Sequence, residues 1–94
     1  MIVEILPIAR DDVDQALIYI AADDPAAADR LYDDMLDKLN QVSQHPYSAP
    51  EITIGRRVYR RVYVHPYNLY YLIVHDRILV MRVLHERMDT RTRL

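Results

Sequence analysis

The spacing of apolar residues changes at Gly55, the only glycine of the chain, and this change constrains the fold more than any other feature. Upstream of it, apolar side chains recur at helical spacing over residues 8–22 and 25–44, which predicts two amphipathic helices. Asp24 can cap the second helix, and Pro25 suits its first helical position. Because the two helices are joined so tightly, we expect an antiparallel helical hairpin.

Downstream of Gly55, the pattern is typical of strands. Three extended runs rich in Val, Ile, Leu and Tyr are separated by short polar breaks and predict an antiparallel meander, at residues 57–64, 67–74 and 78–84. A short strand is expected at residues 2–6, closed by Pro7, and residues 47–53 are expected to form a loop. The predicted order is β-α-α-β-β-β, an α+β fold in which the helical hairpin packs on an antiparallel sheet.

The length of the chain allows one domain. Ninety-four residues are too few for two independent cores, and a hydrophobic fraction of 51% suffices for one. Residues 1–94 are therefore expected to form a single domain, with residues 85–94 as a basic C-terminal tail. The absence of cysteine excludes a disulfide framework, a thiol nucleophile and a cysteine zinc site. Because we find neither a membrane-length apolar run nor a signal-peptide pattern, we expect a cytoplasmic protein.

The net charge of −2 hides an asymmetry between the two halves. Residues 1–54 carry 11 acidic and 3 basic side chains, a net charge of −8, whereas residues 55–94 carry 3 acidic and 9 basic ones, a net charge of +6. The acidic residues of the helices are interpreted as a solvated face. The basic half indicates a surface for an anionic partner.

Alternation divides the side chains of the strand at 57–64 between two faces. One face carries Val58, Arg60, Val62 and Val64, and the other carries Arg57, Tyr59, Arg61 and Tyr63. Guanidinium groups pair with phosphates and carboxylates, and Tyr adds rigid contact area, so the second face is a candidate binding surface. The alternative is that arginine is simply the main cation of a chain whose sole lysine is Lys38. Tyr70 and Tyr71 point to opposite faces, one toward the helices and the other toward a partner or a neighbouring strand.

Three histidines recur at ten-residue intervals, but their predicted positions do not form a metal site. His65 and His75 lie at opposite ends of one strand, roughly 30 Å apart. His65 and His85 lie nearer the same end, on strands separated by a third, about 10 Å apart. No carboxylate companion completes a ligand set, so we expect no metal.

Acid–base cleavage of RNA is compatible with the residues of the basic half. This reaction needs a group that takes the 2′-hydroxyl proton, a group that protonates the leaving oxygen, and cations for the phosphate. His85, a tyrosine and the arginines at positions 60, 61 and 82 could fill these roles. The simpler explanation for His85 is that it ends a strand and forms local hydrogen bonds.

The order and spacing of several short segments resemble the ParE branch of the RelE/ParE family of bacterial toxin–antitoxin toxins, which includes plasmid-stabilisation proteins. The resemblance covers nearly the whole chain. The segments are Pro7-Ile8-Ala9, Tyr19-Ile20-Ala21, Asp24-Pro25, Ala27-Ala28, His45-Pro46, Arg60-Arg61-Val62, Asn68-Leu69-Tyr70-Tyr71 and the ending Arg82-Val83-Leu84-His85-Glu86-Arg87-Met88-Asp89. The closing Arg-Val-Leu-His-x-Arg-x-Asp is the part most like ParE.

This resemblance implies a small α+β toxin that is encoded beside its antitoxin and uses no cofactor. ParE-like toxins poison DNA gyrase by trapping it on cleaved DNA, without catalysing a reaction. Their antitoxin is a ParD-like dimer that binds DNA, so DNA is contacted mainly through the antitoxin, and its disordered tail folds onto the toxin. We expect that tail to be acidic and to contact Arg57, Arg60, Arg61, Tyr63 and Arg82. The target is expected at His85, Arg87, Arg91 and Arg93.

Two other functions stay open at this stage. RelE-like relatives cut messenger RNA on the ribosome with lysines, arginines and a late tyrosine or histidine. In this chain the strands carry no lysine and no tyrosine follows Leu84, but His85 with Arg61 and Arg82 could form such a site. The third possibility is a degenerate member that binds its antitoxin and no longer poisons a target.

Overall fold

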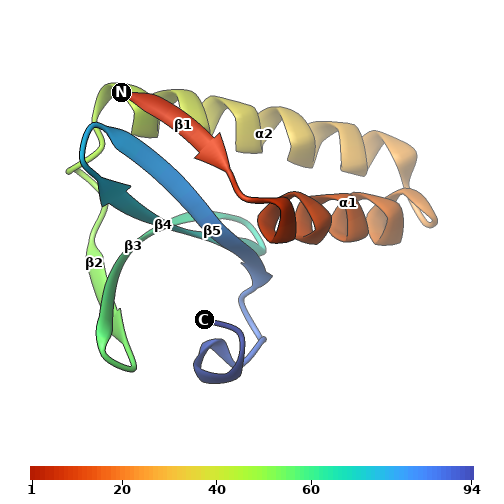
Figure 1. The fold of residues 1–94 in the computed structure, drawn as a ribbon. Coiled ribbons are helices and arrows are strands. Elements are labelled where there is room, and N and C mark those ends of the chain that lie inside the picture. Colours follow the sequence, from red (N-terminus) through yellow and green to blue (C-terminus); the bar gives the residue numbers. More distant parts are fainter.

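A hairpin of two helices lies on one face of a curved five-stranded sheet (Figure 1) in the computed structural model, which describes all 94 residues. The helices are α1 (Pro7–Ala21) and α2 (Pro25–Gln44). The carboxylate of Asp24 accepts hydrogen bonds from the backbone N–H groups of Ala26 and Ala27. The predicted cap, the proline at the first helical position and the helical hairpin are therefore confirmed.

The strands form one mixed sheet in the order β1-β5-β4-β3-β2. Their bounds are β1 (Ile2–Ile5), β2 (Glu51–Ile54), β3 (Arg57–Val64), β4 (Tyr67–Val74) and β5 (Arg77–His85). The predicted meander of the last three strands and the α+β fold are confirmed, and β2 extends the meander at its outer edge. The sheet is not wholly antiparallel, because β1 pairs with β5 in parallel.

Strand β2 begins where the sequence predicts a loop, so that prediction is wrong for residues 51–53. The strand has only four residues, between Pro50 and a tight turn, and its Ile-x-Ile alternation is too short to stand out from loop sequence. Gly55, at φ 63°, occupies the first position of the two-residue turn to β3. This left-handed conformation favours glycine and closes the β2–β3 hairpin.

The main core lies between the helices and the sheet. Apolar residues of α1, α2, β3, β4 and β5 meet there, among them Ala9, Leu31, Met35, Leu69 and Val80. A smaller cluster under the end of α2 contains Tyr71, which is 1% exposed and donates its hydroxyl to the Pro46 carbonyl at 2.7 Å. Tyr71 is thus the tyrosine that packs on the helix side.

A third apolar cluster lies on the opposite face of the sheet. It contains Ile54, Tyr59, Tyr70 and Leu84, and Leu94 of the C-terminal segment packs against it. Tyr70 is therefore used in cross-strand packing and is closed to a partner, as is Tyr59 at 3% exposed. Consequently the face of β3 that carries Arg57, Tyr59, Arg61 and Tyr63 is partly core.

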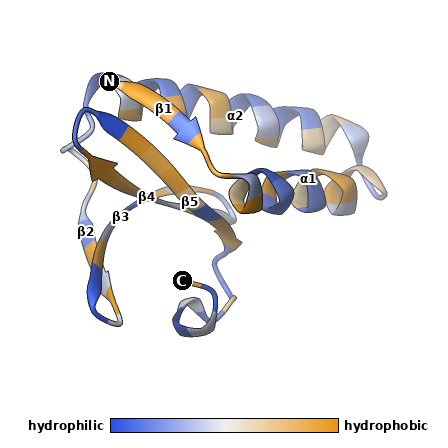
Figure 2. Ribbon diagram, viewed as in Figure 1, coloured by the Kyte–Doolittle hydropathy of each residue, from blue (hydrophilic) through white to orange (hydrophobic).

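The C-terminal tail is folded rather than extended. It contains the short 3₁₀ helix η1 (Thr90–Thr92), and the Asp89 carboxylate accepts a hydrogen bond from the Arg91 N–H at 3.0 Å. Figure 1 shows this segment curled beside the sheet, on the side away from the helices. In Figure 2 it is mostly hydrophilic, whereas β4 and β5 are predominantly hydrophobic. Neither helix is long and apolar enough to cross a bilayer.

Candidate functional site

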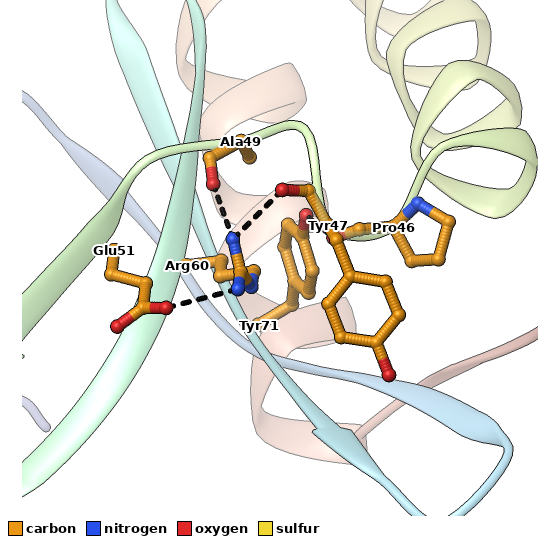
Figure 3. A network of polar contacts seen from close by, with 6 residues as sticks. All are labelled: Pro46, Tyr47, Ala49, Glu51, Arg60 and Tyr71. Carbon is orange, nitrogen blue, oxygen red and sulfur yellow. Dashed lines mark hydrogen bonds and ion pairs between the residues drawn. The ribbon is translucent and has the colours of Figure 1, made fainter.

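Arg60 points toward the segment between α2 and β2, which it binds at two places, and it also binds the first residue of β2 (Figure 3). Its guanidinium donates to the carbonyl oxygens of Tyr47 and Ala49, at 3.0 and 2.7 Å, and to the Glu51 carboxylate at 3.0 Å. The guanidinium carbon also lies 5.3 Å from the centre of the Tyr47 ring, in cation–π range. Arg60 therefore holds the α2–β2 connection in place.

Arg82 joins the first helix to the end of the sheet. Its guanidinium forms a bidentate pair with Asp12 at 2.8 and 2.9 Å, and the Asp12 carboxylate also accepts the Val83 N–H at 3.0 Å. The Asp12 hydrogen bond is the main reason that the pKa of Arg82 lies above its usual value. The same guanidinium donates to the Arg93 carbonyl at 2.9 Å, which ties the tail to the sheet.

Asp12 corrects the interpretation that the acidic helix residues are all solvated. Its side chain is 13% exposed, against 54% for the capping Asp24. Strand β1 pairs with β5 only as far as Val80, so the N–H of Val83 lies beyond the last residue that β1 can reach. Asp12 supplies the missing acceptor from the neighbouring helix.

Tyr63, His65 and Glu86 form a hydrogen-bonded chain at the far end of β3. The Tyr63 hydroxyl donates to Glu86 at 2.8 Å and lies 2.7 Å from His65 Nδ1. Because a phenol has one proton to donate, His65 Nδ1 must carry a hydrogen and act as the donor in the second contact. The bond to Glu86 is also the main cause of the raised pKa of Tyr63.

His85 and the tail arginines have local partners of their own. The His85 ring packs edge-on against Tyr67, with 5.4 Å between ring centres, and its Nδ1 accepts the Arg87 N–H at 3.1 Å. Arg91 forms an exposed ion pair with Asp89 at 3.3 Å. The Arg87 and Arg93 side chains are exposed and form no ion pair.

The arginines and the histidine predicted to form binding or catalytic sites do not gather at one place. A groove of about 700 Å³ between α1 and the tail is lined by Arg82, His85 and Arg93, together with the exposed Tyr19. Arg61 does not line this groove and faces a separate hollow beside α2. Arg57 and Arg61 are exposed and make no ion pair. The guanidinium groups of Arg60 and Arg82, in contrast, bind Glu51 and Asp12. No three histidine, aspartate or glutamate side chains lie close enough together to hold a metal ion.

The helical hairpin exposes apolar side chains that the sequence analysis did not single out. Ile18 and Tyr19 of α1 are 71% and 80% exposed, and Tyr32 and Leu36 of α2 are each 46% exposed. Ile18, Tyr32 and Leu36 flank two shallow apolar hollows, one between α1 and α2 and one near the α1–α2 turn. Tyr19 instead lines the groove beside the tail. The sequence could have indicated that Ile18 and Tyr19 are exposed, because both lie outside the apolar stripe of α1 that faces the core. A set of large apolar side chains left in solvent indicates a surface that a partner covers.

The fold agrees with the outcome of sequence comparison. The family model described as "ParE toxin of type II toxin-antitoxin system, parDE" matches residues 3–90. The chain belongs to the ParE toxin family. No curated protein matches it significantly.

Membership of the ParE family confirms the resemblance found in the sequence and fixes the general class of activity. The protein is a toxin of a type II toxin–antitoxin system, and its partner class is an antitoxin. The two-layer α+β architecture, with helices on one face of the sheet, is consistent with the RelE/ParE fold.

Proposed function

We propose that this ParE-family toxin poisons DNA gyrase and is neutralised by a ParD-like antitoxin, whose acidic, disordered tail folds onto it. The exposed apolar surface of the helical hairpin carries the antitoxin part of the proposal. An amphipathic segment that folds on binding would cover Ile18, Tyr19, Tyr32 and Leu36, which otherwise stay in water. The poisoning of gyrase and the neutralisation by the antitoxin would both take place in the cytoplasm. The toxin would contact DNA mainly through the antitoxin.

The arginines of β3 would add charge complementarity to this contact. Arg57 and Arg61 are exposed and unpaired, so carboxylates of the antitoxin can reach them, and Tyr63 lies beside them at 47% exposed. Arg60 and Arg82 would act mainly by holding the surface in shape, because their guanidinium groups already bind Glu51 and Asp12.

The target-binding surface is proposed to be the C-terminal segment, with His85, Arg87, Arg91 and Arg93. The positions of Arg61 and Arg82 relative to the groove beside this segment support a non-catalytic action. The guanidinium of Arg82 is occupied by Asp12, and Arg61 lies outside the groove, so neither arginine of the alternative catalytic set is free beside His85 to bind a scissile phosphate. Ribosome-dependent cleavage of messenger RNA by His85, Arg61 and Arg82 is the alternative function.

One paired assay tests the choice of target. Purified toxin is added to a gyrase supercoiling reaction, with a measurement of cleaved DNA, and in parallel to a translation reaction probed for cuts in messenger RNA. We expect loss of supercoiling, accumulation of cleaved DNA and intact messenger RNA. Cut messenger RNA with unaffected gyrase would contradict the proposal and favour the alternative.

Two variants separate the proposed surfaces. Charge reversal at Arg57 and Arg61 together is expected to weaken antitoxin binding at least about tenfold and to reduce its salt dependence. The matched control is Arg77→Glu, which reverses an exposed charge at the start of β5. Replacement of Arg87 and Arg93 by Ala is expected to reduce gyrase poisoning while antitoxin binding is kept. Unchanged affinity and salt dependence in the double charge reversal would contradict the electrostatic part of the proposal.

A further inference from the structure

One buried tyrosine in the groove between α1 and the tail has no hydrogen-bond partner. Tyr67, the first residue of β4, is 7% exposed, and its ring packs in the main core. Its hydroxyl forms no hydrogen bond within the chain, in contrast to the hydroxyls of Tyr63 and Tyr71. Because no fully buried polar side-chain atom lacks a partner, this hydroxyl must reach solvent, and the cavity that Tyr67 lines is the groove. The Tyr67 hydroxyl is therefore aimed into the groove.

Burial keeps the Tyr67 hydroxyl protonated. Desolvation is the main cause of the raised pKa of Tyr67, and the neighbouring Tyr19 is the second cause. The group is thus a hydrogen-bond donor at neutral pH. A largely buried donor without a partner is unfavourable, and a ligand oxygen that accepts its proton would remove this cost.

His85 supplies a second donor beside Tyr67. The two rings are in edge-on contact, with 5.4 Å between their centres, and both residues line the groove. His85 Nδ1 accepts the Arg87 N–H, so the proton of the neutral imidazole lies on Nε2. Nε2 has no hydrogen-bond partner within the chain. The groove therefore offers two adjacent, uncharged donors to the oxygen atoms of a small ligand.

The walls of the groove leave apolar surface in water. Ile8 and Tyr19 of α1 and Met88 of the tail are all exposed there. Tyrosine rings and methionine sulfur atoms both make favourable contacts with aromatic rings. Gln15 of α1 also lines the groove, is exposed and forms no side-chain hydrogen bond, so its amide oxygen can accept an N–H of a ligand.

The charges that line the groove balance. Asp12 is paired with Arg82, whereas Asp11 and Arg93 are exposed and form no ion pair. An ion that entered the groove would lose hydration without gaining from a net opposite charge, so an uncharged ligand is favoured. The volume of about 700 Å³ lies within the range of small-molecule sites.

We propose that the groove between α1 and the tail binds a small, uncharged aromatic amide. The amide oxygen accepts hydrogen bonds from the Tyr67 hydroxyl and His85 Nε2, and the amide N–H donates to Gln15. The aromatic ring packs against Tyr19 and Met88, which otherwise stay in water. The inference goes beyond the proposed function, because this site needs neither antitoxin nor gyrase.

A series of three small molecules tests the site on the unaltered protein. Benzamide is titrated into ¹⁵N-labelled protein, and we expect saturable shifts of the Ala16 and His85 amide signals, with a Kd of about 1–5 mM. Acetophenone keeps the ring and the carbonyl oxygen but has no N–H, and it should bind about threefold more weakly. Benzoate carries a negative charge and should bind about tenfold more weakly than benzamide.

The Tyr67→Phe substitution removes the hydroxyl and keeps the buried ring. Because this hydroxyl has no partner in the chain, the urea midpoint should not fall, but benzamide should bind about three- to tenfold more weakly. The matched control is Tyr47→Phe, which removes another unpaired hydroxyl outside the groove and should leave benzamide binding unchanged. A hydroxyl that only contacts solvent would give equal benzamide binding in the two variants.

Four results would overturn the proposal. They are no saturable shift at about 20 mM benzamide, shifts confined to the hollow between α1 and α2 at Leu36, equal benzamide binding by Tyr67→Phe, and tighter binding of benzoate or of a short oligoribonucleotide than of benzamide. The last result would mean that the groove takes an anionic ligand. The ligand series decides the question independently of any effect of the substitution on folding.

Discussion

At the scale of single residues, Asp12 and Arg82 show how one ion pair can hold three parts of the chain together. The pair lies 70 residues apart in sequence and joins α1, the end of β5 and, through Arg93, the tail. Both side chains are largely buried, so their interaction is screened less than that of an exposed pair. Removing one partner would leave the other without its hydrogen bonds.

The Asp12→Ala substitution is expected to lower the free energy of unfolding by about 2 kcal/mol, because Arg82 and the Val83 N–H lose their acceptor. Urea unfolding measures this change. Asp11→Ala is the matched control, since Asp11 is exposed and forms no ion pair, and it should change stability by less than about 0.5 kcal/mol. If the two variants lose the same free energy of unfolding, the ion pair between Asp12 and Arg82 does not contribute to stability.

The buried hydroxyl of Tyr71 makes stability dependent on alkaline pH. Burial raises the pKa of Tyr71, so the folded protein keeps this proton to a higher pH than the unfolded chain. The stability that Tyr71 contributes is therefore fully present below the pKa of an unfolded tyrosine, about 10. It is lost as the pH rises through the pKa of Tyr71 in the folded protein.

We expect Tyr71→Phe to cost about 1 kcal/mol at neutral pH, because the hydrogen bond to Pro46 is lost. Its stability should then fall less steeply than that of the unaltered protein as the pH rises above about 10. Unfolding measured across this range compares the two slopes. Parallel slopes would mean that Tyr71 does not contribute to the alkaline loss.

At the scale of elements, two hairpins of the meander have tight turns that begin in the left-handed region. Gly55 has φ 63° between β2 and β3, and His75 has φ 57° between β4 and β5. A Cβ atom at Gly55 would meet no atom within 4 Å, so only backbone strain opposes a side chain there. His75 already carries such strain.

These two turns predict stability changes of opposite sign. Gly55→Ala should destabilise the protein by about 1 kcal/mol, whereas His75→Gly should stabilise it by about 0.5–1 kcal/mol. Thermal unfolding of both variants, with Arg56→Ala at the adjacent turn position as a control, measures the effect. If the His75→Gly variant is instead less stable, the imidazole must contribute more to the free energy of unfolding than the backbone strain at His75 costs.

At the scale of the whole molecule, the central strands β4 and β5 contribute to apolar clusters on both faces of the sheet. Leu69 packs toward the helices and Leu84 toward the tail, and they are 2% and 1% exposed. Because the two clusters share the same strands, loss of either should destabilise the entire fold rather than one layer.

We expect Leu69→Ala and Leu84→Ala each to lower the free energy of unfolding by about 2–5 kcal/mol, with no change in the denaturant slope. Leu36→Ala, at a half-exposed position of α2, should cost less than about 1 kcal/mol. Denaturant titration followed by both helix and tyrosine signals provides the measurement. Separate transitions for the two signals would contradict a single cooperative unit.

The local pattern by itself determined the helices, their cap and the last three strands. These features depend on residues close together in sequence, such as Asp24 before Pro25, and on apolar spacing that one window can contain. The order of short segments along the chain was also sufficient to indicate the ParE family, which the family comparison confirmed. The assignment of individual arginines to the antitoxin or the target remains a prediction.

Only the tertiary structure decided how the polar residues are used and where the sheet ends. Arg60 and Arg82 looked alike in sequence to the exposed Arg57 and Arg61, but their partners, Glu51 and Asp12, depend on how distant elements pack. The parallel pairing of β1 with β5 and the short β2 likewise follow from contacts across the whole chain. Local spacing does not encode which segments meet, because burial and pairing arise only after the chain has folded.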